Sequence, residues 1–566
     1  MDWTALGDFA AREKCAEERE WERLNGILIS ELEQDGRVLS GSLQGELFSG
    51  RNTENAVRLR EDDRVMLLPL LGNGTLGQAI RQAGDYVVTA DIEAVLANNK
   101  FDLQPRGRLQ PGPCVMSPAG PLEEGYENLF NVLEACNNGT APELDAFLSA
   151  ALDRKPPLFC THEALRKTLN SEVNPGKSEF HLIQGPPGTG KTHLIGQLVA
   201  EWANKGYSVL VTAFTNRAVD EILRKIVTAN TPNNVPPLIR VGRDRIRKEL
   251  NIQCSNNIAP RPGSVLGTTL YKCAQRAAKG LGSAFDVVII DEGSQVTLPS
   301  FCATSLLGRA IILVGDHRQL APVVVQQPSN EPGEDLYRMS AFEYLVNRHP
   351  FYCLNETRRL NRHVCTFISA KYYDGTLTPH TSSADQVWPS DLSEPVWMNG
   401  SPGVCHIVAT PEQYPQQCSP HEADIVAQII EQIEKIKGTW LSSRDHLNSS
   451  TPPTLVAPYE RRYVISCLFR EQVALVRKAL NNKSIKGHLW QVDTVERNQG
   501  QTGSIAILCV GASDETQGRD RAWTLDPRRW NVALSRGRFA AYVVASSPFC
   551  DFIQNNAKGL VSTVRI

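Results

Sequence analysis

The residues best suited to chemistry form a glycine-rich run that follows an apolar stretch at 180–183 and precedes an expected helix at 193–202. The run reads Gly185, Pro186, Pro187, Gly188, Thr189, Gly190, Lys191 and Thr192. Between a strand and a helix, such glycines let backbone N–H groups turn inward around phosphates, and the helix N-terminus adds partial positive charge. We expect Lys191 to neutralise the β- and γ-phosphates of ATP and Thr192 to place its hydroxyl on Mg²⁺. The pattern predicts a nucleoside triphosphate site.

Two adjacent carboxylates, Asp291 and Glu292, end a second apolar stretch at 287–290. We expect Asp291 to hold the Mg²⁺ shell and Glu292 to orient and deprotonate the attacking water. An apolar stretch that ends in Asp-Glu is common by itself. Behind a phosphate-binding loop of the same predicted sheet, however, it indicates a site that hydrolyses ATP.

Polar residues after two further apolar stretches extend this site. Gln319 lies in the run from Leu313 to Pro322, and an amide beside the phosphates can report whether the γ-phosphate is present. Thr215 and Asn216 follow the stretch at 209–212, where hydroxyl and amide groups suit sequence-independent contact with nucleic-acid phosphates. The alternative for these two residues is plain capping of the helix that follows.

From about residue 155 to 550 the chain resembles the superfamily 1 helicases. Segments similar to that family's motifs occur in the family's order: Val209–Asp220, Asp291–Gln295, Leu313–Pro322, Asn355–Leu360, Val492–Gln501 and Arg529–Arg538. The resemblance implies that Arg359 and Arg536 reach the γ-phosphate from a second domain, as arginine fingers that stabilise charge on the transferred phosphoryl group. It also implies that Gly500 belongs to the nucleotide site and that Thr268 and Thr494 contact nucleic acid.

Within the superfamily, the motifs are similar to the branch that holds the nonsense-mediated-decay RNA helicase and the replication nuclease-helicase. That resemblance implies 5′-to-3′ movement on single-stranded or tailed duplex DNA or RNA, and a small β-barrel with stalk helices before the motor. Two positions depart from the family: Thr161 stands where Gln is usual, and Arg358 where Tyr is usual. Because an arginine can stack on a purine through its guanidinium plane, we expect relaxed discrimination for adenine and measurable GTP hydrolysis.

The elements that must position these residues follow an α/β pattern. After about residue 155, short apolar stretches alternate with polar or glycine-rich turns, as parallel sheets require. We expect two tandem RecA-like P-loop domains with parallel sheets, 155–345 and 346–566. Before them we expect a polar, mostly exposed N-terminal helix (1–24), a β-rich, barrel-like module (25–117) and a helical stalk (118–154). Residues 91–96 suit a strand or a helix equally well.

Bulk composition excludes several other classes of protein. The chain has 566 residues, of which 41% are hydrophobic and 21% charged, unlike a disordered or collagen-like chain. Its net charge of -3 argues against indiscriminate coating of phosphates but leaves room for a local basic channel. None of the 14 cysteines forms a C-x-x-C pair, and neither a secretory signal nor a membrane-spanning run is present. We expect a cytoplasmic protein, or a nuclear one in a eukaryote.

A local basic run leaves two interpretations open. It comprises Arg240, Arg243, Arg245, Arg247 and Lys248. These side chains suit either a solvated helix face or a contact to the nucleic-acid backbone.

Three functions compete at this point. The first is ATP-dependent translocation along a single strand with unwinding of duplex, and the second is an ATPase that remodels protein–nucleic acid complexes without unwinding. The third, a nucleotide-gated binding platform without catalysis, is disfavoured because Lys191, Glu292 and Arg536 are all present.

Overall fold

The computed structural model describes residues 1–546 and Phe549, with gaps inside that range. The gaps are 35–36, 45, 51–63, 70–73, 84–85, 97–99, 106–110, 120–122, 152–154, 242–244, 256, 281–284, 325–337, 385–403, 410–417, 436–462 and 513–517. None of the described helices combines the length and the hydropathy that crossing a bilayer requires.

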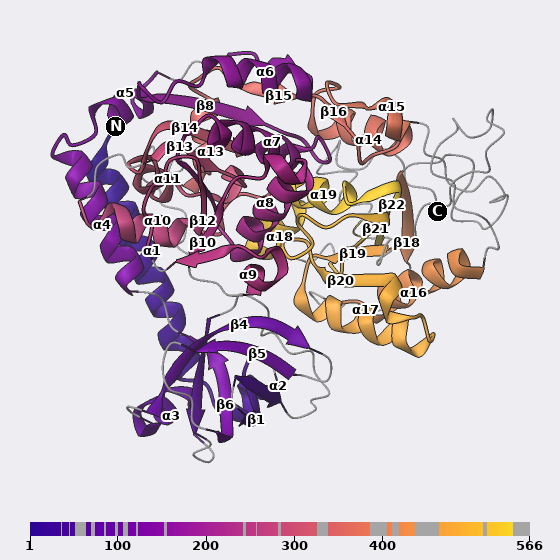
Figure 1. Ribbon diagram of the computed structural model, residues 1–566. Coiled ribbons are helices and arrows are strands. Elements are labelled where there is room, and N and C mark those ends of the chain that lie inside the picture. Colours follow the sequence, from indigo (N-terminus) through magenta and orange to yellow (C-terminus); the bar gives the residue numbers. More distant parts are fainter. Residues whose placement is uncertain are drawn as a thin grey trace.

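A parallel sheet of nine strands carries the phosphate-binding loop (Figure 1). Its order is β11-β10-β12-β9-β13-β14-β8-β15-β7. The strands are β7 (Leu158–Cys160), β8 (Glu179–Gln184), β9 (Val209–Ala213), β10 (Leu238–Val241), β11 (Gln253–Ser255), β12 (Val265–Thr269), β13 (Phe285–Ile290), β14 (Gly308–Gly315) and β15 (Tyr352–Leu354). The central strands are apolar runs because helices cover both faces of the sheet. Strand β15 comes from beyond the domain break expected near residue 345.

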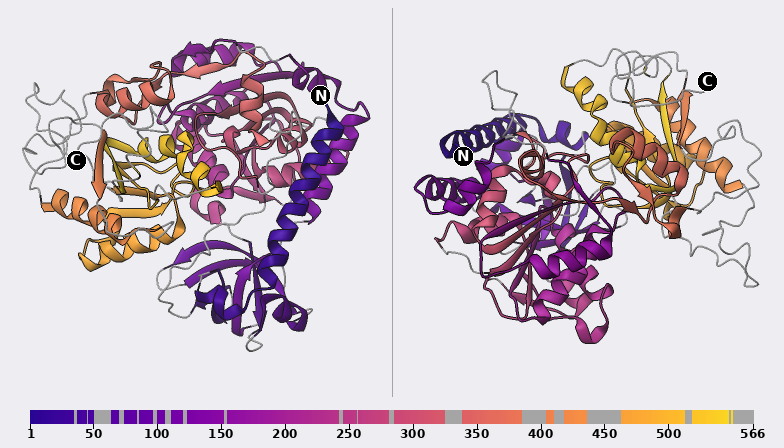
Figure 2. Two further views of the ribbon diagram at one scale, coloured as in Figure 1. Left: turned by 180° about the vertical axis from the view of Figure 1, so that it is seen from behind. Right: turned by 90° about the horizontal axis from the view of Figure 1, so that it is seen from above.

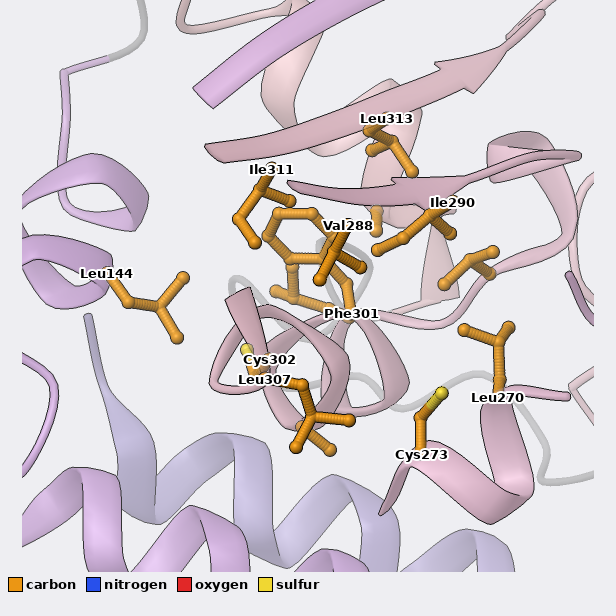
Figure 3. Packing of buried hydrophobic residues seen from close by; sticks show 14 of the residues in the cluster. Leu144, Leu270, Cys273, Val288, Ile290, Phe301, Cys302, Leu307, Ile311 and Leu313 are labelled. Atoms are coloured by element: carbon orange, nitrogen blue, oxygen red, sulfur yellow. The ribbon is translucent and has the colours of Figure 1, made fainter. Parts of the chain in front are cut away.

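Helices bury the two faces of this sheet in separate cores. They are α6 (His162–Glu172), α7 (Lys191–Asn204), α8 (Asn216–Thr228), α9 (Arg245–Leu250), α10 (Leu270–Ala277), α11 (Leu298–Ser305) and α13 (Ala341–Val346). One core joins β8 and β9 to α7 and α8. In the other, Val288 of β13 and Leu313 of β14 pack against Phe301 of α11 (Figure 3).

A second parallel sheet of five strands follows, in the order β18-β22-β21-β19-β20. Its strands are β18 (Val404–Ala409), β19 (Tyr463–Cys467), β20 (Trp490–Thr494), β21 (Gly503–Cys509) and β22 (Gly537–Ser546). Its helices are α14 (Arg362–Tyr372), α16 (Pro420–Lys435), α17 (Arg470–Asn482), α18 (Gly518–Leu525) and α19 (Pro527–Leu534). A short parallel pair, β16 (Glu356–Thr357) and β17 (Thr378–Pro379), with α15 (Thr381–Ala384), lies between the two sheets in the chain. The predicted fold of two tandem parallel-sheet domains is confirmed.

The β-rich module near the N-terminus is a closed antiparallel barrel in the order β1-β2-β5-β4-β3-β6. Its strands are β1 (Leu39–Gln44), β2 (Leu47–Gly50), β3 (Arg64–Pro69), β4 (Val88–Leu96), β5 (Lys100–Pro105) and β6 (Gly112–Pro118). Phe48, Phe101 and Met116 fill the interior, while α2 (Ile29–Gln34) and α3 (Leu76–Ala83) pack outside it. The ambiguous residues 91–96 belong to strand β4.

Two long helices, α1 (Trp3–Asn25) and α4 (Glu123–Asn137), run side by side between the barrel and the first α/β domain (Figure 2). A short helix, α5 (Pro142–Leu148), follows them. The expectation that the N-terminal helix is mostly exposed is wrong: Trp3 and Leu6 are buried in the core of the first domain. Trp21, near the other end of α1, packs instead against the buried residues that α2 and α3 share with β3 and β6 on the outside of the barrel, here called the barrel cluster.

Candidate active site

The phosphate-binding loop connects β8 to α7 in the conformation that its glycines allow. Gly188 and Gly190 have φ angles of 74° and 83°, in the left-handed region that favours glycine. A Cβ on Gly185 would come within 2.1 Å of Cγ of Lys191, so the loop closes tightly around the lysine stem. The Thr189 hydroxyl donates to the Pro186 carbonyl over 2.9 Å, which holds the turn shut.

Lys191 is partly buried in this loop, and its ammonium group donates to the Gly185 carbonyl. Burial lowers the pKa of Lys191, an effect that the nearby Asp316 and Asp291 carboxylates oppose. A triphosphate would supply the anionic partner that a desolvated ammonium group lacks.

The two predicted carboxylates stand at the carboxyl end of β13. The Thr192 hydroxyl lies 3.5 Å from Oδ2 of Asp291, so the loop and the strand end meet as expected. Burial raises the pKa of Asp291. Burial, with the neighbouring Asp291 charge, raises the pKa of Glu292 to about 7. A hydroxyl and a carboxylate are the hard oxygen ligands that Mg²⁺ prefers, so this pair fits that ion.

Glu292 has a φ of 54°, unusual for a residue with a side chain. Its N–H donates to Oδ1 of Asp291 over 2.8 Å. That hydrogen bond fixes the turn after β13 and holds the Asp291 carboxylate in place.

Gln319 lies behind the loop and is buried. Its amide donates to Oδ2 of Asp316 over 2.6 Å, and the Gln184 amide donates to Oδ1 of the same carboxylate over 3.1 Å. Asp316 follows β14, the strand beside β8, so this carboxylate lies close to the loop. The arrangement holds the Gln319 amide on Asp316, at the end of the strand beside β8.

The second domain reaches the loop directly through β16 and the residues after it. Thr357 is buried, and its hydroxyl donates to the Pro187 carbonyl over 2.8 Å. The Arg358 N–H donates to the Gly188 carbonyl over 2.9 Å. A Cβ on Gly188 would come within 2.3 Å of Cβ of Arg359, so only glycine permits this approach. The structure therefore brings Arg359 to the edge of the loop.

Arg536, the second predicted finger, is buried just after α19. Its guanidinium donates to the Val532 carbonyl over 2.7 Å and to the Ser535 hydroxyl over 3.2 Å. Burial lowers the pKa of Arg536 to about 10, against the opposing effect of Asp316 and Glu292. The Arg359 guanidinium donates to the Ser535 carbonyl over 3.2 Å, so the two arginines approach each other at Ser535.

The threonines expected to contact nucleic acid are either engaged in helix capping or buried. The Thr215 hydroxyl accepts from the Ala218 N–H over 3.1 Å and caps α8, as the alternative interpretation proposed. The side chains of Thr268 and Thr494 are buried, so neither offers its hydroxyl to an approaching strand in this structure. Gly500, expected in the nucleotide site, is exposed with a φ of 79°.

The basic run does not form one charged face. Arg240 is fully buried; its guanidinium donates to Oδ1 of Asp220 and to Oδ1 of Asn216, each over 2.8 Å. Both interpretations are therefore wrong for Arg240, and Asn216 is committed to this cluster. Arg243 lies outside the described residues. Arg245, Arg247 and Lys248 belong to α9, but their side chains are not described.

Several residues at the site were not predicted from the sequence. Thr357 has no motif role, although it precedes the arginines that the motif predicted. His162 and His193 lie beside the loop with ring centroids 5.5 Å apart, and burial lowers the pKa of His162 to about 4. Thr161, one of the two departures from the resembled motifs, has a structural role: its hydroxyl accepts from the Ala164 N–H and caps α6.

Two family profiles, each described as an AAA domain, match the chain, one over residues 160–261 and 260–327 and the other over 337–548. A DNA replication ATP-dependent helicase/nuclease of Arabidopsis thaliana is 26% identical over 441 residues, 72% of this chain and 30% of that protein. A protein of the same description from Mus musculus is 24% identical, over 91% of this chain and 52% of its own length.

A regulator of nonsense transcripts 1 homolog of Arabidopsis thaliana is 27% identical over 66% of this chain and 32% of that protein. Among solved structures, the helicase nonstructural protein 10 of an arterivirus has 13% identity and a TM-score of 0.40, covering 93% of this chain and 79% of that chain. The chain thus spans 30% and 52% of the length of the first two relatives.

Proposed function

The chain belongs to superfamily 1 of the helicases, and on that premise we propose that it hydrolyses ATP to move along single-stranded DNA or RNA and unwind duplex. The observation that carries the proposal is the divided site. The loop, Lys191 and the carboxylates lie on one α/β domain, while Arg359 and Arg536 come from the other. A site split between two domains couples nucleotide turnover to movement of one domain against the other.

Each residue takes a distinct role in the proposed reaction. The loop N–H groups and Lys191 bind the phosphates, and Thr192 with Asp291 would hold Mg²⁺, which neutralises phosphate charge when bound. Glu292, with its pKa near 7, accepts the proton of the attacking water. Arg359 and Arg536 stabilise the charge that develops on the transferred phosphoryl group.

In the proposed cycle, ATP draws the two α/β domains together and hydrolysis lets them move apart. The Thr357 and Arg358 contacts to the loop support this, because they tie the second domain to the element that reads the phosphates. Alternate tightening and release on a strand would then move the motor. From the branch of the family we propose 5′-to-3′ movement, in the cytoplasm or, in a eukaryote, the nucleus.

One set of assays tests the proposal. ATP turnover is measured with and without single-stranded DNA and RNA, and strand displacement is measured on duplexes with a 5′ or a 3′ tail. We expect stimulation by at least one polymer, displacement from the 5′ tail, and loss of turnover in Lys191→Ala with an unchanged thermal midpoint. Turnover that neither polymer stimulates would overturn the motor. Stimulation without displacement would favour a remodeller of protein–nucleic acid complexes.

A further inference from the structure

A chain of buried polar side chains crosses from the first α/β domain to the second behind the nucleotide site. Its members are Asp316, which follows β14, Tyr373, which ends α14, and Asn531 of α19. All three are at most 4% exposed. A buried polar group is costly unless it is hydrogen-bonded, so a chain of them at a domain boundary calls for an explanation.

The hydrogen bonds of this chain are short and continuous. The Tyr373 hydroxyl donates to Oδ2 of Asp316 over 2.7 Å and accepts from the Asn531 amide over 2.8 Å. The Asn531 amide also donates to the Arg318 carbonyl over 2.8 Å. Asn531 of the second domain is thus bonded to the first domain twice, directly and through Tyr373.

The first-domain end of the chain is the residue that holds Gln319. Oδ2 of Asp316 accepts from the Gln319 amide as well as from the Tyr373 hydroxyl. The second-domain end is α19, and Arg536 lies two residues past the end of that helix. The expected γ-phosphate sensor and the helix before the expected arginine finger are therefore joined through one carboxylate, one phenol and one amide.

We propose that Tyr373 is a positioning residue that couples the Gln319 amide to the arginine-bearing helix α19 through Asp316 and Asn531. This inference rests on the proposed ATPase function. When the Gln319 amide turns to a γ-phosphate, Asp316 loses one donor, and the Tyr373 hydroxyl keeps that carboxylate satisfied. The hydrogen bonds to α19 then remain when Gln319 changes partner, so Arg536 keeps its position relative to the phosphates.

The chemistry of Tyr373 suits this role across ordinary pH. Burial and the adjacent Asp316 carboxylate raise the pKa of the Tyr373 hydroxyl well above its usual value, so it remains a donor. A donor to a buried carboxylate contributes more than a neutral pair does. Tyr373 also differs from the preceding residue in the sequence, Tyr372, whose buried hydroxyl has no hydrogen-bond partner among the described residues.

That neighbour provides a matched control. Tyr373→Phe removes one hydroxyl that both donates and accepts a hydrogen bond, whereas Tyr372→Phe removes a buried hydroxyl for which the described residues offer no partner. We measure kcat and KM for ATP with saturating single strand, the affinity for a fluorescent ADP, and the thermal midpoint. Tyr373→Phe should lower kcat about tenfold with KM and ADP affinity within about twofold of wild type, because the interaction is needed during turnover. Tyr372→Phe should keep the wild-type kcat.

A second variant tests the same inference independently, in case Tyr373→Phe does not fold. Asn531→Ala breaks the same chain at its other end, so the double variant should be no slower than the slower single variant. Wild-type kcat in Tyr373→Phe, equal losses in both tyrosine variants, or additive losses with Asn531→Ala would overturn the inference. If no polymer stimulates the wild-type protein, the proposed motor fails, and Tyr373 is judged on kcat without polymer.

Discussion

Three features of Glu292 and its surroundings suit the catalytic base that we propose it to be. It is held in a left-handed turn, burial raises its pKa to about 7, and its neighbour Asp291 lies beside the Thr192 hydroxyl, with which we propose that it holds Mg²⁺. Two adjacent carboxylates with different surroundings can take different roles, since the environment and not the residue type decides which one accepts a proton.

The first prediction concerns that division of roles. Glu292→Gln should lower kcat for ATP by roughly a thousandfold, the order of a lost general base, while ATP affinity changes little because the loop and Lys191 remain. Turnover and binding of a fluorescent ATP analogue are measured on the same preparation. A variant that retains a tenth of wild-type kcat would exclude Glu292 as the base.

The second prediction concerns the nucleotide base. The Thr161 hydroxyl is committed to capping α6, and the exposed Arg358 can stack on either purine, so neither residue selects adenine. GTP hydrolysis should therefore be measurable beside ATP hydrolysis under the same conditions. A Lys191→Ala preparation serves as the blank for contaminating GTPases. Strict dependence on ATP would contradict the prediction.

Among single residues, roles that depend on a contiguous motif can be predicted from the sequence, whereas contacts between residues distant in the sequence cannot. Gly185–Thr192 is contiguous, so its role could be predicted from its spacing alone. The burial of Arg240 could not be predicted because its partner Asp220 belongs to another element, α8, and meets Arg240 of β10 only in the folded domain. Tyr373 belongs to no motif, and only the meeting of α14, β14 and α19 gives it two partners.

Helix α16 shows how an element can bury a charge outside the active site. Its Glu422 is fully buried, and Oε2 accepts from the Gly511 N–H over 2.8 Å. Burial raises the pKa of Glu422 to about 8. The facing Cys509 thiol stays neutral because burial raises its pKa too, and the facing Gln472 carries no charge. Neither of these two neighbours supplies a positive charge to an ionised Glu422.

The third prediction follows from this carboxyl group. Between pH 4.5 and 8 the folded state holds a proton that the unfolded chain has released, so the free energy of unfolding falls as pH rises. Glu422→Gln keeps the acceptor for Gly511 and cannot ionise, so it should stabilise the protein at pH 8.5 relative to wild type. The gain should be on the order of a few kcal/mol. Urea unfolding of both proteins at pH 6 and 8.5 measures the difference. Equal pH slopes would contradict it.

Elements with uniform apolar character were the most predictable. The stretches at 180–183, 209–212, 287–290 and 311–314 all became central strands, because burial on both faces requires continuous apolar residues. The burial of helix α1 could not be predicted because its apolar residues, such as Trp3, Leu6 and Phe9, are outnumbered by charged residues. Which of its sides is buried depends on α4 and the first domain, which lie elsewhere in the chain.

The whole molecule consists of two α/β domains and a barrel held on a pair of helices (Figure 2). Helix α1 contacts two modules: Leu6 lies in the core of the first domain and Trp21 packs on the barrel cluster. A rigid helix fixed at both ends would carry the barrel along with the first domain, not the second. The barrel therefore has a defined position relative to the phosphate-binding loop.

The last prediction tests whether the two ends of α1 act separately. Leu6→Ala empties a fully buried site in the first-domain core and should cost about 2–5 kcal/mol there. Trp21→Ala should instead loosen the barrel. In hydrogen exchange, Leu6→Ala should speed exchange in α1, α4 and α10, whereas Trp21→Ala should speed it in β3, β6 and α3 and leave the phosphate-binding loop unchanged. Thr4→Ala, an exposed substitution on the same helix, is the control. If both variants loosen both modules alike, the barrel and the first domain unfold as one cooperative unit, and α1 is part of that unit instead of a link between two.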